Sequence, residues 1–163
     1  MIVSKVYGLL KSRLSLIKAE GIQRRIIPVM PMSDSSKCIS GLFPINRIDN
    51  NIHYTSQEYG LSPSGYFGEK GKKGADNWIR QIYTKNPEAE AIRFYDLLSD
   101  GGYEKPLSNG HGFITTMPDG SKITIRIKTS SKDSPAVDLK LEGFHNGVKT
   151  HQKIHFIRTG GSK

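Results

Sequence analysis

The chain has a single cysteine, Cys38, set among polar residues. One cysteine cannot form a disulfide within the chain and cannot supply a cysteine-rich zinc site. The scarcity of cysteine therefore excludes a disulfide scaffold, and we interpret Cys38 as incidental.

Long apolar stretches are also missing. Hydrophobic residues make up 36% of the 163 positions, and no run of 18 apolar residues exists that would predict a transmembrane helix. The first 20 residues lack the continuous apolar segment of a signal peptide. We expect no stable membrane insertion, and the length fits one modest domain with an arm, or two very small domains.

Acidic residues are scarce at both ends of the chain. The net charge is +9 and the pI is about 9.7. Residues 1–48 carry eight Lys or Arg against two Asp or Glu, residues 49–100 carry six against eight, and residues 101–163 carry ten against five. A basic balance of this size favours a polyanionic partner, which could be nucleic acid, a membrane surface or an acidic protein.

The N-terminal part is expected to be an arm. Residues 1–20 have apolar positions near helical spacing with Lys and Arg between them, and residues 21–52 are interrupted by Pro, Gly and Ser. The arm could be a basic amphipathic segment that meets a membrane or partner, or a short helix packed on the domain. We predict a basic helical arm and linker over residues 1–40 and a compact domain over residues 41–163.

Two helices are expected in the middle of the chain. Residues 53–74 are predicted to form loops, with Lys72 and Lys73 in a basic loop, "GEKGKKG", that could contact phosphate. The first helix is predicted over Ala75–Lys85, with Trp78 in the core. The second begins with Asn86 as its N-cap and Pro87 at its first position, and it ends before the Gly pair at 101–102.

The last third changes from helical periodicity to alternation. Strands are predicted over Gly112–Met117, Lys122–Ser130, Ala136–Leu141 and His151–Ile157. Asp-Gly at 119–120 and "HNG" at 145–147 are hairpin signals, so the links are short and the strands antiparallel. We therefore predict an α+β fold with N-terminal helices packed on a twisted antiparallel sheet of four or more strands.

Alternation along these strands separates an apolar set from a basic set. If the apolar set packs on the helices, the opposite face carries an unusual excess of cations. Its members are Thr124, Arg126, Lys128, Asp138, Lys140, Lys153 and His155, with Lys122 and Ser130 following. A solvated face is common in antiparallel sheets, but it would mix the two signs of charge more evenly.

That face has the groups needed to cleave RNA without a metal. Such cleavage needs a base for the 2′-hydroxyl, an acid for the leaving 5′-oxygen, and cations for the phosphate. His residues can transfer the protons, and Arg and Lys can bind the phosphate. His111, which lies in "NGHGF" beside glycines that allow close backbone approach, is a second candidate with His155.

A metal site is not expected. The carboxylates of this region are scattered, and His151 and His155 lie about 13 Å apart if their segment is a strand. His145 is in a hairpin turn and is interpreted as structural or solvated. We predict no metal and no other cofactor.

The last third resembles a known family. "GHGFITTMPDGSKITIRIKTSSKDSPAVDL" and the later "QKIHFIR" are similar to C-terminal toxin domains of bacterial polymorphic and contact-dependent inhibition systems, the group that includes barnase, EndoU, colicin RNases and RelE. The resemblance rests on the Asp-Gly hairpin, Arg126 with the following Ser/Thr-rich turn, the strand after Pro135, and the closing strand at Lys153–Phe156.

The resemblance implies a metal-independent RNase, often directed at tRNA, that a bacterium delivers into the cytoplasm of competing cells. It also implies an inhibitory immunity protein, which we expect to be acidic, and a monomer before that protein binds. The catalytic candidates are His155, His111, Arg126, Lys128, Lys153, Ser130 and Thr129. The RNA-binding candidates are Lys122, Thr124, Lys132, Lys140, Lys72 and Lys73.

Two other interpretations of the sequence stay open. The basic face could belong to a nucleic-acid-binding module without catalytic activity. Alternatively, the chain could be a secreted effector that binds a protein or membrane through its N-terminal arm.

Overall fold

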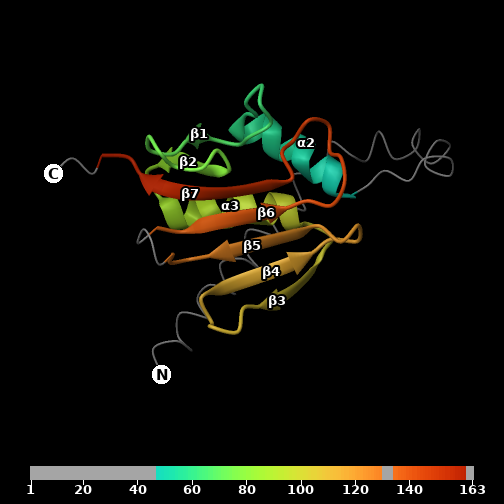
Figure 1. Ribbon diagram of the computed structural model, residues 1–163. Helices are drawn as coiled ribbons and strands as arrows, with labels where there is room; N and C mark the ends of the chain where they lie inside the picture. The colour runs from blue at the N-terminus through green and yellow to red at the C-terminus, as the bar shows by residue number, and fades with distance from the viewer. Residues whose placement is uncertain (1–46, 130–133, 161–163) are drawn as a thin grey trace.

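The computed structural model describes residues 47–129 and 134–160 (Figure 1). These residues form two helices and a seven-stranded sheet, which confirms the predicted α+β class. The helices are α2 (Arg47–Tyr59) and α3 (Pro87–Ser99), and the strands are β1 (Glu69–Lys70), β2 (Ile79–Thr84), β3 (Tyr103–Pro106), β4 (Gly112–Thr116), β5 (Lys122–Arg126), β6 (Ala136–Lys140) and β7 (His151–Arg158). The predicted arm at 1–40 and Cys38 lie outside the described residues.

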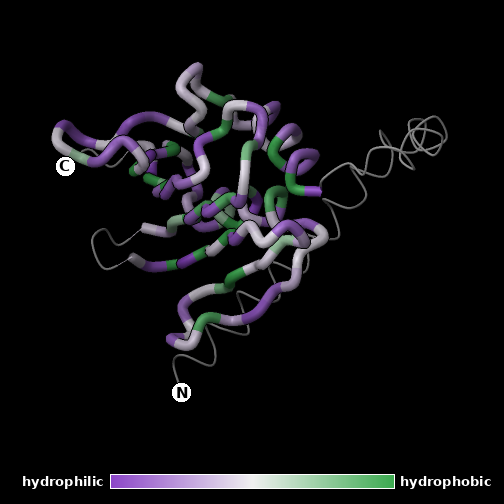
Figure 2. Tube along the Cα trace, turned by 45° about the vertical axis from the view of Figure 1, so that its right-hand side comes forward, coloured by the Kyte–Doolittle hydropathy of each residue, from purple (hydrophilic) through white to green (hydrophobic). Residues whose placement is uncertain are grey.

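The sheet has the strand order β1-β2-β7-β6-β5-β4-β3. Each pair of neighbouring strands from β3 to β7 is antiparallel, and β4 to β7 form the predicted meander. Strand β2 pairs with β7 in parallel, so the sheet is mixed rather than wholly antiparallel. Hydrophobic and hydrophilic positions follow one another along these strands (Figure 2).

The turns explain why the meander forms where the sequence predicts it. Asp119 accepts hydrogen bonds from the backbone N–H and the hydroxyl of Ser121, and Gly120 has the positive φ of 93° that the turn requires. At the second hairpin Asn146 and Gly147 have φ values of 46° and 82°. Consecutive positive φ values match the twist of the flanking strands. Both predicted turns are confirmed.

Helix α3 provides the centre of the core. Its N-cap is confirmed, because the Asn86 side chain accepts a hydrogen bond from the Ala89 N–H at 3.4 Å. Phe94 lies in edge-to-face contact with Phe67 and Phe156. The buried partners of α3 on the sheet are Ile123, Ile125, Val137, Leu139, Ile154 and Phe156. Each such side chain contributes about 1.5–3 kcal/mol when buried, so the core holds α3 against one face of the sheet.

The prediction of a helix over Ala75–Lys85 is wrong. The segment opens with turns, in which the Ala75 N–H donates to Lys72 O and the Ile79 N–H to Asp76 O. It then continues as β2, paired with β7 along its whole length. The short apolar pattern fits either structure. Pairing with β7, together with β-branched Ile and Thr and an aromatic residue, favours the strand.

Helix α2 lies where the sequence predicts linker and loop. Its buried stripe has few apolar residues, Ile48 and Ile52, and is completed by Asn51 and Thr55. The Asn51 amide donates to the carbonyls of Leu98 and Asp100 at 2.9 and 2.8 Å, so tertiary contacts with α3 hold a helix whose own pattern is weak. In the part of the chain that the structure describes, no helix is long and apolar enough to cross a membrane.

Candidate nucleic-acid interface

The face of the sheet opposite α3 gathers the basic residues. Figure 1 shows α3 behind the sheet, so the viewer faces this side, which we call the open face. We define it by the outward positions Ile79, Gln81, Tyr83, Ile114, Thr116, Lys122, Thr124, Arg126, Ala136, Asp138, Lys140, His151, Lys153 and His155. The strand register confirms that the predicted polar sets of β5, β6 and β7 share one side.

One row across the open face has two lysines side by side. Lys122 on β5 is the direct partner of Lys140 on β6, and Lys140 is the partner of His151 on β7. All three side chains are exposed. Like charges directly opposite each other destabilise a sheet. An anionic ligand would remove this repulsion.

The next row contains the acid of the meander. Asp138 is the only Asp or Glu in β4 to β7, and its strand partners are Thr124 and Lys153. Its carboxylate forms an ion pair with Arg126. The pair fixes the guanidinium over the face while Lys153 stays beside it. Lys153 balances Asp138 within this row, and Arg126, which belongs to the next row, adds a further positive charge.

His155 lies in the third row, between Gln81 on β2 and Ala136 on β6. It is 2% exposed, and its Nδ1 is 3.3 Å from the hydroxyl oxygen of Ser134. Gln81 in turn accepts a hydrogen bond from the Tyr83 hydroxyl at 3.0 Å. The imidazole is thus held among polar groups from β2 and from the start of β6. Gln81 and Tyr83 are not among the predicted site residues, because their segment is predicted to be a helix and is in fact β2.

A cavity of about 450 Å³ adjoins this region. It lies where β5 and β7 end near the first turn of α3, and Lys128, Ser134 and Arg158 are among its lining residues. Ser134 contacts His155 and also lines the cavity. A phosphate held at this end of the sheet would meet two cations, Lys128 and Arg158, and one acidic residue, Glu88.

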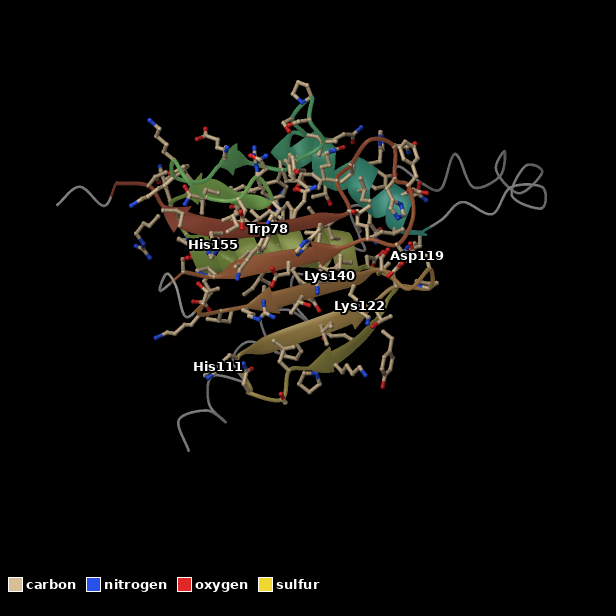
Figure 3. The ribbon with its side chains drawn as sticks, in the orientation of Figure 1. Trp78, His111, Asp119, Lys122, Lys140 and His155 are labelled. Carbon is tan, nitrogen blue, oxygen red and sulfur yellow. The ribbon has the colours of Figure 1, made fainter. Side chains whose placement is uncertain are left out.

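His111 is not brought near His155. It is exposed and directly precedes β4, where its carbonyl accepts from the Ile127 N–H at 3.0 Å. Two strands separate β4 from β7, which places the two histidines about 14 Å apart across the sheet. Figure 3 shows both histidines at the same end of the sheet, separated across the strands. The predicted close approach beside His111 does occur, because a Cβ on Gly112 would lie 1.8 Å from Ile125 O.

The remaining predicted residues lie around the rim or outside the described segments. Thr129 follows β5 and donates to Ser134 O at 3.3 Å. Lys72 and Lys73 are exposed in the loop between β1 and β2. Ser130 and Lys132 lie outside the described residues.

The sequence predicts Trp78 in the core, and this prediction is wrong. Trp78 is half-buried and stacks on His151, with ring centroids 4.6 Å apart and planes inclined by 17°. His151 and His155 both lie on β7, as expected for a strand, four positions apart. Within residues 47–129 and 134–160, no group of three or more His, Cys, Asp or Glu side chains could hold a metal ion.

No protein-family model matches the chain, and neither a curated protein nor a solved structure is significantly similar to it.

Proposed function

We propose that this protein is a metal-independent RNA endonuclease that leaves a 2′,3′-cyclic phosphate. The observation that supports it is the position of His155, a histidine fixed among polar groups on a face whose neighbouring strands carry an excess of cations. Histidine transfers protons near neutral pH, and the cations suit a phosphodiester. A metal is not needed for this reaction.

The reaction requires two proton transfers around one phosphorus atom. The 2′-oxygen attacks the phosphorus while a base takes its proton, and the bond to the 5′-oxygen breaks while an acid protonates that oxygen. Charge that develops on the non-bridging oxygens is stabilised by fixed cations. Hydrolysis of the cyclic phosphate is a separate step.

In this proposal His155 performs one of the two proton transfers. Arg126, which is held by Asp138, binds the phosphate together with Lys153. Because His111 is about 14 Å away across the sheet, we assign it to contacts with distant nucleotides. The second transfer then falls to a group near His155, either Lys153 on the same strand or the Tyr83 hydroxyl. Lys128 and Thr129 contact the flanking phosphate.

The biological setting of the proposal follows from the resemblance described above. The enzyme would be a toxin domain, directed at tRNA, that is delivered by the producing bacterium and acts in the cytoplasm of a competing cell. An acidic immunity protein would complement the open face, and the toxin would be a monomer before it binds. The fold supports this setting because α3 packs on one face of the sheet, while Lys122, Lys140 and His151 are exposed on the other.

The test is an RNA cleavage assay in EDTA. The full chain is incubated with total tRNA, and products are analysed for 2′,3′-cyclic phosphate ends. We expect defined cuts that disappear in His155→Ala and persist in His53→Ala, a matched change at an exposed position of α2. RNA that stays intact in EDTA and also after Mg²⁺ is added would disprove the proposal.

A nucleic-acid-binding module without catalysis is the second candidate. The Lys122–Lys140 pair favours it, since two adjacent exposed lysines would attract a polyanion without any contribution from His155. Here we would expect binding that weakens with salt, that is unchanged by His155→Ala, and that leaves the RNA intact.

A further inference from the structure

The β2 side of the open face carries aromatic rings. Tyr83 is 50% exposed, and it lies two positions after Gln81, the strand partner of His155. Trp78 precedes β2 at its other end, where it stacks on His151. His155 therefore lies between two aromatic groups that are about 17 Å apart along the strand.

Both rings are fixed before any ligand binds. The Tyr83 hydroxyl donates to the Gln81 side chain, and the Trp78 carbonyl accepts from the Lys153 N–H at 2.8 Å. The indole is further oriented by its stack on His151. Groups that are already ordered lose little conformational entropy when a partner binds.

Three of the cations lie on the other side of His155, while Lys153 is on β7 itself. Arg126 and Lys122 are on β5, Lys140 is on β6, and Figure 3 shows Lys122 and Lys140 across the sheet from Trp78. The open face is therefore divided, with aromatic rings along β2 and positive charge along β5 and β6. This division matches a single strand whose bases lie on one side and whose phosphates lie on the other.

We propose that Tyr83 and Trp78 are base-stacking subsites on either side of His155, so that the substrate is an unpaired RNA segment lying along β2 and β7. The inference rests on the proposed function and names the form of RNA that the same face takes. A duplex buries the faces of its bases within its own stack, so it cannot offer them to Tyr83 or Trp78.

Trp78 provides the first test, because it is the only tryptophan in the chain. Its fluorescence is followed in the His155→Ala chain, which prevents the proposed cleavage. A short single-stranded RNA should quench the emission and shift it, whereas polyphosphate and a duplex of the same sequence should not. Equal effects of polyphosphate, or equal affinity for the duplex, would overturn the inference.

Substitution of Tyr83 provides the second test. Tyr83→Leu should raise the Kd for the single strand by about 5- to 100-fold, the loss expected for one stacked base, and Tyr83→Phe should keep most of the affinity. The matched control is Phe144→Leu, an aromatic that is 83% exposed in the connection between β6 and β7. Equal losses in Tyr83→Leu and Phe144→Leu, or none in either, would disprove the subsite.

These tests separate this inference from the proposed enzyme. Binding that depends on Tyr83 without any cleavage would disprove the nuclease and leave the stacking subsites in place. Cleavage that depends on His155 but is unchanged by Tyr83→Leu would support the nuclease and disprove the stacking subsite at Tyr83.

Discussion

Lys122 and Lys140 lie directly opposite each other on β5 and β6, both exposed on the open face. No acidic residue occupies their row, which continues to Thr116 on one side and His151 on the other. Within the described residues, no salt bridge involves either lysine. The pair therefore costs stability in the free protein, and an anionic ligand would relieve that cost.

Lys140→Glu should therefore stabilise the protein while it weakens RNA binding. The substitution replaces a like-charge pair with an opposite-charge pair and should raise the free energy of unfolding by about 0.2–1 kcal/mol. Urea denaturation measures the gain, and titration with single-stranded RNA measures the loss. The control is Lys149→Glu, an exposed lysine outside the sheet rows. Equal effects of both substitutions on RNA binding would argue against a specific role for the row.

The salt dependence of RNA binding should report how many lysines contact phosphate. Lys122→Ala should lower the slope of log K against log salt by about 0.7, the value for one phosphate contact on a single strand. Lys70→Ala, a change on the edge strand β1, should leave the slope unchanged. A slope that does not change in Lys122→Ala would place this residue outside the binding surface.

Much of the fold follows from local sequence patterns. Strands β4 to β7 are predictable because side chains alternate strictly and because glycines at 120 and 147 fix the turns. Helix α3 is predictable from the Asn86 cap and Pro87. The parallel pairing of β2 with β7 is not, because it joins segments about 70 residues apart and no local signal encodes it.

The same limit applies to the candidate site. Alternation alone predicts that Arg126, Lys153 and His155 share a face. It cannot give the strand order, which separates His111 from His155 and places β2 beside β7. The sequence therefore does not predict that Gln81, Tyr83 and the exposed side of Trp78 lie at the site, and only the structure shows it.

Two buried tyrosines should make stability fall at alkaline pH. Burial, followed by the neighbouring Glu90 carboxylate, raises the pKa of Tyr59, and burial also raises the pKa of Tyr95. A raised pKa in the folded state means that this stability is complete below the unfolded pKa of about 10 and is lost as pH rises above it. Urea denaturation at about pH 8 and about pH 11 should show the loss.

The matched variant for that measurement is Tyr95→Phe. The Tyr95 hydroxyl lies 3.0 Å from Glu104 Oε2 and 2.5 Å from Thr115 Oγ1, so its removal should cost about 1 kcal/mol at neutral pH. Phenylalanine does not titrate, so the difference from the wild type should vanish by about pH 11. A constant difference across the range would show that Tyr95 ionises as readily in the folded protein as in the unfolded chain.

His145 should stabilise the fold without taking part in RNA binding. It is 3% exposed, with Nδ1 at 2.7 Å from Asp49 Oδ1 and Nε2 at 2.6 Å from Glu142 O. These bonds join the first turn of α2 to the connection between β6 and β7. His145→Ala leaves their partners unsatisfied, so the free energy of unfolding should fall by about 1–3 kcal/mol. Thermal and urea denaturation measure the change.

The contrast with His155 makes this prediction specific. His145→Ala should keep full RNA cleavage per folded molecule, because the Asp119 hairpin beside His145 lies at the far end of the sheet from His155 (Figure 3). His155→Ala should abolish cleavage even in the fraction of molecules that remains folded. His53→Ala, at an exposed position, should change stability by no more than about 0.5 kcal/mol. Lost cleavage with unchanged stability in His145→Ala would move the catalytic centre to the hairpin end of the sheet.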